Sequence, residues 1–195
     1  MNRKKKNVLF IIVDCLRSDF VYEPQKAYTP AIQKLKEDGF SFLNTIVSTS
    51  TTTPSFASLF TGLYPFEHGV RSLSGYSPKR DLVTFPQLLK QAGYNTYAEV
   101  TGPLVEQVGF SEYFEEYNCR DPEQTIHTEW GANFLDSLEK DYQEPWFILL
   151  HIWSLHTPRV VIDDCDDERY GQTLYARALA SIDKYLEQLF SKIDD

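Results

Sequence analysis

Two continuous apolar runs dominate the hydrophobic pattern of this chain. The first extends from Asn7 to Val13 and is followed by Asp14, and the second extends from Trp146 to Trp153. Neither run alternates with polar residues, which is typical of strands that are buried on both faces in the parallel sheets of α/β proteins. We therefore predict two core strands, with His151 of the second run as a buried core histidine.

Shorter segments between the two runs alternate between helical and strand patterns. They predict a helix opened by Thr29-Pro30 and closed by Gly39, a strand over 40–47, a helix from a Thr84–Gln87 capping box to Gly93, and a strand over Asn95–Val100. A parallel sheet needs a crossover connection between paired strands. The order therefore predicts an α/β fold, a mostly parallel sheet flanked by helices on both faces.

The remaining segments are helical, aromatic or loop-like. Helices are predicted over 125–138 and 170–193, where apolar residues recur at three- and four-residue steps. Residues 106–117 are aromatic and acidic, which is compatible with a substrate lid, although the spacing favours a satellite of the core. The Gly- and Ser-rich residues 69–79 predict a loop, which we expect at the mouth of an active site.

Composition places the chain among globular proteins with a single domain, here residues 1–195. Hydrophobic residues make up 42% of the 195 residues and charged residues 24%, which is enough for a sizeable core. The net charge of −9 argues against a nucleic-acid partner, because nucleic acids are bound by basic surfaces. The three cysteines are widely spaced and show neither a disulfide framework nor zinc-ligand spacing.

The basic residues 3–6 precede the first apolar run in the manner of a signal peptide. The run is only about seven residues long, is followed by Asp14 and has no small-residue cleavage site. No segment approaches the roughly twenty apolar residues of a membrane-spanning helix. We therefore expect no membrane span and a cytoplasmic location.

The segment from Thr51 to Gly62 has the features of a short helix with hydroxyl groups at its start. Pro54 suits the first helical position, and Gly62 suits the left-handed position after the end. Thr52 and Thr53 then precede the helix, where free N–H groups and the helix dipole favour an anion. A phosphate or sulfate ester could bind there against a threonine oxygen. The alternative is a threonine-capped helix without chemistry.

Asp14 is a second candidate for chemistry. Ligands of open α/β sheets bind beyond the carboxyl ends of the strands, and Asp14 is expected at such an end. A carboxylate there is a natural ligand for a hard divalent cation, and the alternative is a cap for the following turn. We expect the oxygen of Thr52 and the carboxylate of Asp14 to face one cleft.

Together these segments resemble the sulfatase-like branch of the alkaline phosphatase–sulfatase superfamily. The resembling residues are Asn7–Asp19 (NVLFIIVDCLRSD), Tyr28–Ile32 with Leu35 and Gly39-Phe40, Thr52–Val70 (TTPSFASLFTGLYPFEHGV), Phe147–Pro158 (FILLHIWSLHTP) and the helix Tyr175–Phe190. The resemblance spans nearly the whole chain and is weakest over 77–144. It implies an alkaline phosphatase-like three-layer sandwich and a metal-dependent hydrolase or transferase of phosphate or sulfate esters.

The resemblance also implies roles for three residues. Asp14 matches the first metal-binding aspartate, Thr52 matches the nucleophile, and His156 matches a histidine that contacts the substrate oxyanion or leaving group. The implied cofactor is a divalent metal ion, Zn²⁺, Mn²⁺ or Ca²⁺, which activates the hydroxyl and neutralises charge on the transferred group. The implied partner is a small-molecule phosphate or sulfate ester.

Three positions depart from the sulfatase pattern. Cys15 stands where many sulfatases have a second aspartate, and we expect it to be a small buried residue. Thr52 replaces the Cys or Ser that is oxidised to formylglycine, a route that threonine cannot follow, and Phe56 replaces a common arginine. Threonine is the nucleophile of phosphodiesterase and phosphoglycerol-transferase relatives. Phosphoester or phosphonate chemistry through a phospho-threonine intermediate is therefore favoured.

The second metal-binding pair of the family, an Asp-His or Asp-Asn followed by Gly, has no counterpart in this sequence. A catalytic metal usually takes three or more protein ligands. We therefore expect a truncated, N-terminal part of the family's fold, and the alternative function is a catalytically inactive fragment or pseudoenzyme. A missing strand would leave an open sheet edge, which predicts a homodimer.

Other polar residues support weaker hypotheses. Arg17 and Arg71 are cations near the proposed site, where each could bind an ester oxyanion or pair with a carboxylate. His127 is expected on a helix surface, and His68 has no assigned role. The acidic residues of 163–167 lack the ligand spacing of an EF-hand, which favours a solvated loop.

Overall fold

The computed structural model describes residues 4–193, and their contacts divide the chain into two compact units. The first unit comprises the chain up to Ile12, Thr45–Pro122 and Tyr142–His151. The second comprises Val13–Asn44, Glu123–Asp141 and the chain from Ile152 onward. Neither unit is a continuous half of the sequence. The assignment of one domain to residues 1–195 stays a prediction.

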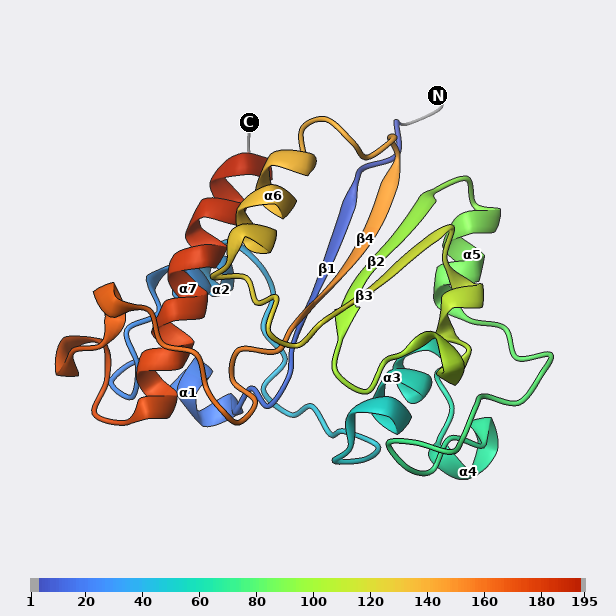
Figure 1. Cartoon of the computed structure of the whole chain (residues 1–195), viewed down its shortest axis with the longest axis horizontal. Helices are drawn as coiled ribbons and strands as arrows, with labels where there is room; N and C mark the ends of the chain where they lie inside the picture. The colour runs from blue at the N-terminus through green and yellow to red at the C-terminus, as the bar shows by residue number, and fades with distance from the viewer. Residues whose placement is uncertain (1–3, 194–195) are drawn as a thin grey trace. The chain divides into compact units, whose positions relative to one another are not determined.

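Four strands of the described residues form one sheet (Figure 1). They are β1 (Val8–Val13), β2 (Asn95–Thr101), β3 (Glu116–Arg120) and β4 (Trp146–Ile152), in the order β1-β4-β2-β3. β2 pairs in parallel with β3 and with β4, so that Tyr97 lies opposite Glu116 on one side and Ile148 on the other. Parallel neighbours that are not consecutive in the sequence require crossovers, as predicted for an α/β fold.

The two apolar runs differ in burial. All seven residues of β4 are buried, as predicted for a core strand. β1 lies at the edge of the sheet, and its residues are half-buried or exposed. The prediction of a fully buried first strand is wrong, because β1 has a neighbouring strand on one side only within residues 4–193. β1 and β3 are the two edge strands of the sheet within the described residues, and the homodimer stays a prediction.

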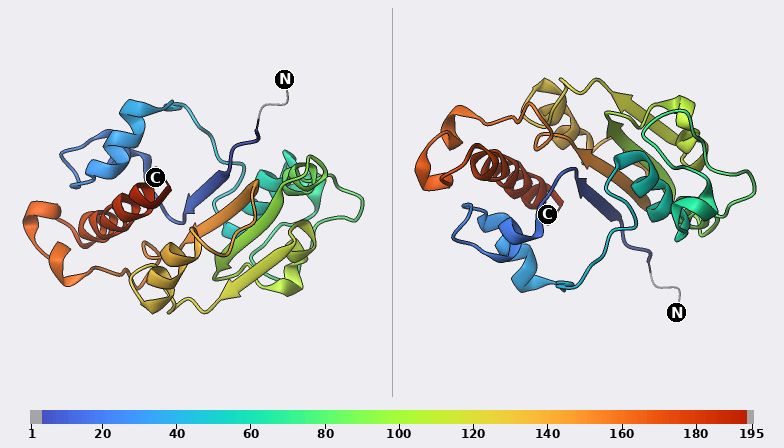
Figure 2. Two further views of the ribbon diagram at one scale, coloured as in Figure 1. Left: turned by 90° about the horizontal axis from the view of Figure 1, so that it is seen from above. Right: turned by 90° about the horizontal axis from the view of Figure 1, so that it is seen from below.

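The first unit adds helices to one face of the sheet. Its helices are α3 (Thr52–Thr61), α4 (Pro65–His68) and α5 (Phe85–Gln91), and its 3₁₀ turns are η1 (Glu106–Val108) and η2 (Phe110–Tyr113). α3 and α5 lie on the same side of the strands (Figure 2). α5 begins with the predicted capping box, in which the side chains of Thr84 and Gln87 each bind the other's backbone.

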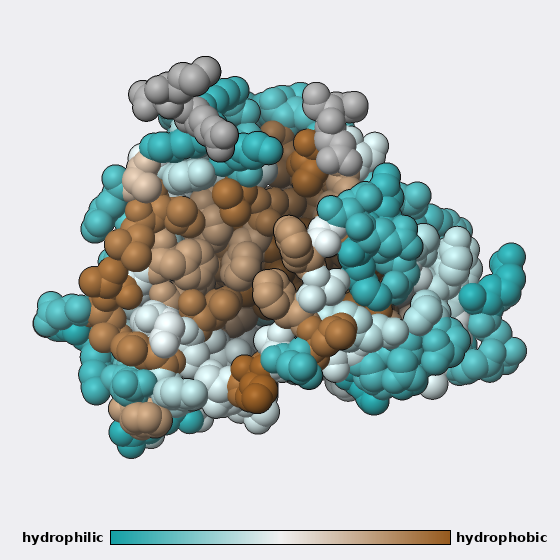
Figure 3. Space-filling model, turned by 180° about the vertical axis from the view of Figure 1, so that it is seen from behind, coloured by the Kyte–Doolittle hydropathy of each residue, from teal (hydrophilic) through white to brown (hydrophobic). Residues whose placement is uncertain are grey.

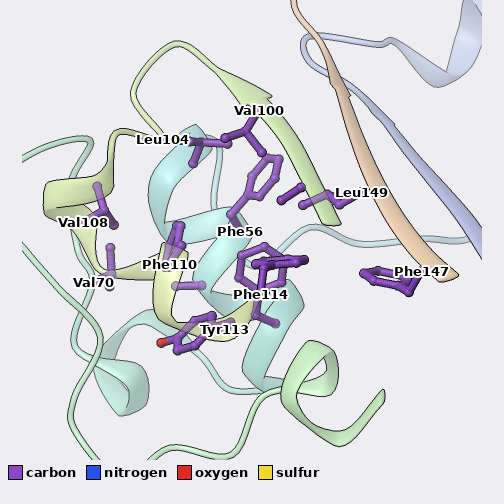
Figure 4. Packing of buried hydrophobic residues seen from close by; sticks show 13 residues of the cluster. Phe56, Val70, Val100, Leu104, Val108, Phe110, Tyr113, Phe114, Phe147 and Leu149 are labelled. Atoms are coloured by element: carbon purple, nitrogen blue, oxygen red, sulfur yellow. The ribbon is translucent and has the colours of Figure 1, made fainter. Parts of the chain in front are cut away.

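The core of the first unit is aromatic. Phe60 of α3 is 2% exposed, and its ring lies 5.2 Å from Phe110, 6.0 Å from Tyr113 and 5.8 Å from Phe114, centroid to centroid. Edge-to-face pairs at these distances add to the burial of apolar area. Figure 4 shows the three rings gathered beside α3. The buried aromatic side chains of residues 106–117 therefore belong to the core, as the predicted satellite of the core requires.

The second unit is mostly helical. It contains α1 (Ser18–Tyr22), α2 (Pro30–Asp38), α6 (Glu129–Ser137) and α7 (Leu174–Ile193), with 3₁₀ turns η3 (Asp163–Cys165) and η4 (Glu168–Tyr170). α6 and α7 each begin four residues later than predicted, because turns precede their first regular hydrogen bonds. No helix within residues 4–193 is long and apolar enough to cross a membrane.

The segment between α2 and α3 differs most from its prediction. The pattern predicts a strand over 40–47, but the structure has none there. Phe40 is 98% exposed and Ile46 is 93% exposed, and Phe42, Leu43 and Val47 are exposed as well. Apolar residues form a strand only where a neighbouring strand supplies hydrogen bonds, and no described strand pairs with this segment. Figure 3 shows apolar surface on the face of the molecule that is seen from behind.

Candidate functional site

Thr52 is the first residue of α3 and belongs to the first unit. Thr51 is the N-cap, with an extended backbone and a carbonyl that accepts the N–H of Ser55 at 3.1 Å. The first N–H groups of a helix have no acceptor inside the helix, and the helix dipole adds partial positive charge there. Thr52 is half-buried at this end. An anion is therefore favoured beside its hydroxyl.

The helix begins two residues earlier than predicted. We expected Thr52 and Thr53 before the helix and Pro54 at its first position, but Pro54 is the third helical residue. Proline is tolerated there because the N–H of this position has no partner inside the helix. Gly62 takes the predicted left-handed conformation with φ 72°, and its N–H donates to the carbonyl of Ser58 at 2.8 Å.

The neighbouring threonines Thr52 and Thr53 have different environments. Thr53 is fully buried, and its hydroxyl donates to the carbonyl oxygen of Leu73 at 2.9 Å. That bond commits Thr53 to packing, because a buried hydroxyl that loses its partner costs free energy. Thr52 keeps partial exposure at the helix start. The greater exposure of Thr52 therefore favours it over Thr53 as a reacting residue.

His68 ties α4 to α3. It is fully buried, its Nδ1 accepts the N–H of Val70 at 3.1 Å, and its Nε2 donates to Ser58 Oγ at 3.0 Å. The proton is assigned to Nε2 from these partners. Burial lowers the pKa of His68 below its ordinary value and so favours the neutral ring. This histidine supports the helix that carries Thr52.

Asp14 belongs to the second unit and follows β1 directly. Its N–H donates to the carbonyl oxygen of Ile152, the last residue of β4, at 2.9 Å. The Cys15 thiol donates to Asp14 Oδ1 at 2.9 Å. Asp14 itself is half-buried. The side chain thus lies at the carboxyl end of the sheet, as predicted.

Cys15 corrects one expectation. We expected a small buried residue, but Cys15 is exposed because it lies in the turn after β1 rather than in the strand. Its φ is +60°, a left-handed conformation that few residues other than glycine adopt. Desolvation and the neighbouring Asp14 carboxylate raise its pKa to about 11. The thiol therefore stays protonated at neutral pH, which disfavours it as a metal ligand.

His156 lies beyond the carboxyl end of β4, as predicted, and also belongs to the second unit. Its ring stacks on Trp153, with centroids 4.1 Å apart and planes at 15°. Its Nδ1 lies 3.0 Å from the carbonyl oxygen of Thr157. A carbonyl only accepts, so Nδ1 carries the proton, and Nε2 of the neutral ring keeps a lone pair. Nε2 is therefore the ring atom suited to a substrate or a cation.

The structure brings two of the three predicted residues to neighbouring strand ends. Asp14 follows β1, His156 follows β4, and the hydrogen bond from Asp14 to Ile152 links the two strand ends. Thr52 lies in the other unit. The expectation that Thr52 and Asp14 face one cleft stays a prediction.

The donor set fits only part of a metal site. Asp14 suits a hard cation, and His156 Nε2 suits Zn²⁺. Within residues 4–193, however, no group of three or more His, Cys, Asp or Glu side chains could hold a metal ion. Because catalytic metals usually take three or more protein ligands, the described residues do not form a complete site by themselves.

The other polar candidates have structural explanations. Arg17 pairs with Asp19 at 2.8 Å, which confirms the carboxylate alternative for this cation. Arg71 is exposed on the loop after α4. His151 is fully buried, with its ring 5.0 Å from that of Phe56, as predicted for a core histidine.

The prediction that His127 lies on a helix surface is wrong. It lies before α6, and burial lowers its pKa to about 4, so the ring is neutral at physiological pH. It lines a cavity of about 330 Å³ together with residues of α6, α7 and the loop before η3. Asp14, Thr52 and His156 do not line this cavity, which therefore does not mark the predicted site.

Sequence reasoning missed Arg120, the last residue of β3. It is 5% exposed, and its guanidinium donates to the carbonyl oxygen of Val100 at 3.2 Å and to that of His151. One side chain thus links β3 to β2 and β4 at their carboxyl ends. A single arginine has no periodicity, so only its position at the end of a predicted strand could have signalled this role.

The sequence of this chain matches one protein-family model and several known proteins. A sequence model described as Sulfatase matches residues 6–195. N-acetylgalactosamine-6-O-sulfatase from Bacteroides thetaiotaomicron is 33% identical over 104 residues, which cover 49% of this chain and 20% of that protein. The matched stretch is therefore a small part of this relative's length.

Solved structures share the fold. A protein of the alkaline phosphatase superfamily from Vibrio parahaemolyticus has a TM-score of 0.65 and 18% identity, covering 98% of this chain and 51% of that chain. The phosphonate monoester hydrolase of Agrobacterium radiobacter has a TM-score of 0.72 and 14% identity, covering 97% and 59%. These similarities confirm the predicted α/β class and its alkaline phosphatase-like fold.

Proposed function

This chain belongs to the sulfatase family, and from that premise we propose that it hydrolyses or transfers the phosphate or sulfate group of a small-molecule ester, with Thr52 as nucleophile. The matched stretch covers 20% of N-acetylgalactosamine-6-O-sulfatase, so activity, substrate and cofactor are all part of the proposal. The observation that carries it is the half-buried Thr52 at the first position of α3, beside a Thr53 whose hydroxyl is committed to packing.

The proposed reaction has two steps. The Thr52 oxygen attacks phosphorus or sulfur, forms a new bond and loses its hydroxyl proton to water. The ester bond breaks, and the leaving oxygen takes a proton from His156. The N–H groups at the start of α3 stabilise the charge on the transferred group. Water then attacks the threonine ester, releases the transferred group (phosphate, a phosphate monoester, a phosphonate or sulfate, according to the substrate) and restores the hydroxyl.

His156 is proposed to act on the leaving oxygen. Its Nδ1–H donates to the Thr157 carbonyl, which fixes the orientation of the ring. When the ring is protonated, Nε2 also carries a proton, which it can give to the leaving oxygen. The stacked Trp153 ring restricts rotation of the imidazole.

The choice between phosphate and sulfate rests on Thr52. A threonine cannot become formylglycine, which favours phosphoester or phosphonate substrates, and a phosphonate monoester hydrolase shares this fold. The N-acetylgalactosamine-6-O-sulfatase relative keeps sulfate esters of sugars under consideration. A useful panel therefore contains a nitrophenyl phosphodiester, a nitrophenyl phosphonate, nitrophenyl sulfate and N-acetylgalactosamine 6-sulfate.

Members of this superfamily use divalent metal ions, and we propose Asp14 as one ligand of such an ion. Zn²⁺, Mn²⁺ and Ca²⁺ are the candidates, because a carboxylate binds each of them. Residues 4–193 supply an incomplete donor set. Each ion should therefore be added separately in the assay, and Asp14→Asn should abolish any stimulation by the effective one.

Substitution of Thr52 tests the proposal directly. Thr52→Ala should lower turnover at least about 10³-fold, because loss of a nucleophile removes the chemical step. Thr52→Ser should keep part of the activity. Thr61→Ala is the matched control, since Thr61 lies at the other end of α3 and donates to the Ala57 carbonyl at 2.7 Å. Turnover that survives in Thr52→Ala would exclude the mechanism.

A catalytically inactive member of the family is the second candidate function. The incomplete donor set of residues 4–193 favours it. It predicts no turnover of any ester in the panel with any of the three ions. Sulfate or phosphate could still bind weakly at the start of α3, which a titration followed by NMR would detect.

A further inference from the structure

A tyrosine of α7 holds the loop that follows β1. The hydroxyl oxygen of Tyr175 accepts the backbone N–H of Arg17 at 2.8 Å, and the hydroxyl proton is donated to the carbonyl oxygen of Cys15 at 2.9 Å. One side chain thus satisfies two backbone groups of the loop that begins at Asp14. Tyr175 is 158 residues from Arg17 in the sequence, so no local pattern indicates this contact.

The loop needs an external support. Cys15 has a φ of +60°, and a residue other than glycine stays in such a conformation only when its surroundings impose it. The bond internal to the turn, from the N–H of Leu16 to the carbonyl of Val13, is 3.3 Å long. That distance is outside the usual range for an N–H···O bond. The shorter bonds to Tyr175 therefore restrain the backbone of Cys15 and Arg17, while the Cys15 thiol donates to Asp14 Oδ1 at 2.9 Å.

The tyrosine ring is itself fixed. Its centroid lies 4.6 Å from that of Phe20, which is buried, and the guanidinium carbon of Arg159 lies 5.5 Å from it. Desolvation raises the pKa of Tyr175, so the hydroxyl keeps the proton that it donates to Cys15. The ring contacts and the two hydrogen bonds of the hydroxyl thus fix the position of the Tyr175 side chain.

We propose that Tyr175 is a positioning residue, which holds the turn after β1 and thereby sets the direction of the Asp14 carboxylate. This role rests on the proposed function, in which Asp14 acts in the catalytic site. Asp14 is anchored on one side by its bond to Ile152. Without the Tyr175 hydroxyl, the other side of the turn loses both of its shorter bonds and Cys15 can leave the left-handed conformation.

Tyr175→Phe is the direct test, because it removes the hydroxyl and leaves the ring against Phe20. Tyr185→Phe is the matched control, since Tyr185 lies on the same helix and its hydroxyl donates to the Gly131 carbonyl at 3.0 Å. Hydrogen exchange at the Arg17 amide should become at least about tenfold faster in Tyr175→Phe and stay unchanged in Tyr185→Phe. Equal exchange rates in the two variants would overturn the proposal.

Kinetics separate positioning from general destabilisation. With a nitrophenyl phosphodiester, kcat should fall about 10- to 100-fold in Tyr175→Phe, because small misplacements of catalytic groups have effects of that size, and little in Tyr185→Phe. Equal losses of kcat in the two tyrosine variants would contradict the role.

The same experiments distinguish this inference from the proposed function. Turnover in the unaltered chain with no selective loss in Tyr175→Phe contradicts only the positioning role. No turnover in the unaltered chain with any ester and ion contradicts the proposed function, and the role of Tyr175 is rejected with it.

Discussion

α3 in the first unit and the turn after β1 in the second unit are fixed by different kinds of contact. α3 presents Phe56 and Phe60 to an aromatic core, and both side chains are almost fully buried. The turn after β1 is held by hydrogen bonds, among them the two made by Tyr175. Each region carries a candidate residue, Thr52 in one and Asp14 in the other.

This difference is important because apolar packing and hydrogen bonds respond differently to substitutions. Apolar packing is non-directional and distributed over many atoms, so it tolerates small shifts and does not depend on pH. A hydrogen bond is directional, and a buried polar group that loses its partner costs free energy. Thr52 should therefore be displaced only by large cavities in the core, whereas the Asp14 turn should respond to loss of a single oxygen.

The largest expected effect is on the packed side of this comparison. Phe60→Ala should lower the free energy of unfolding by about 3–5 kcal/mol, because it removes a buried ring and leaves a cavity. Phe60 contacts the rings of Phe110, Tyr113 and Phe114, so little can collapse into the space. Urea unfolding followed by circular dichroism measures the change.

Leu59→Ala is the control for that experiment. Leu59 is the preceding residue of α3 and is 41% exposed, so its truncation should cost well under half as much. Equal losses in the two variants would show that the aromatic core does not fix α3, and the contrast between the two regions would disappear.

Asp183 of α7 tests how much hydrogen bonds contribute in the second unit, which also contains the turn after β1. This carboxylate is 2% exposed and accepts the N–H groups of Ala31 at 3.0 Å and Ile32 at 2.8 Å, at the start of α2. Asp183→Asn keeps the shape but replaces one acceptor oxygen with a donor. We expect a loss of about 1–3 kcal/mol in urea unfolding at pH 7, because one buried N–H is left without an acceptor.

Glu187→Gln controls for charge on the same helix. Glu187 is exposed four residues later, and the substitution removes one negative charge while the Asp183 carboxylate still accepts both N–H groups of α2. A loss in Asp183→Asn that is no larger than the loss in Glu187→Gln would mean that the hydrogen bonds to α2 contribute nothing measurable.

Local chemistry explains what the sequence could predict. The capping box of Thr84 and Gln87, the left-handed Gly62 and the continuous run of β4 all depend on residues that are close in the chain. These elements occur at or within a few residues of their predicted positions. The position of Asp14 at a strand end follows from the same local signal.

Contacts between distant residues explain what could not be predicted. A strand over 40–47 requires a pairing partner, and the pattern of the segment itself does not reveal whether one is present. The edge position of β1 depends on sheet order, and Arg120 and Tyr175 act on backbone groups that are far away in the sequence. For the candidate site, the sequence indicated the residues and missed the side chains that hold them.

Glu99 of β2 sharpens the comparison, because it is a titratable group within the packed unit. Burial raises the pKa of its carboxyl from 4.5 to about 7, although Arg120 and the Asn118 amide, which donates to Glu99 at 3.0 Å, act in the opposite direction. Between these two pKa values the folded chain binds more protons than the unfolded chain. The contribution of Glu99 to stability should therefore fall as pH rises from about 4.5 to 7.

The whole shift in the pKa of Glu99 corresponds to an upper limit of about 3 kcal/mol, at about 1.4 kcal/mol per unit. Because the side chain is partly exposed, we expect roughly 1 kcal/mol of stability to be lost between pH 5 and pH 8. Urea unfolding of Glu99→Gln should lack this loss, whereas Glu112→Gln, an exposed control in the same unit, should keep it. A pH dependence that is identical in all three proteins would show that Glu99 ionises as freely in the folded chain as in water, and the packed unit would then contain no shifted carboxyl at this position of β2.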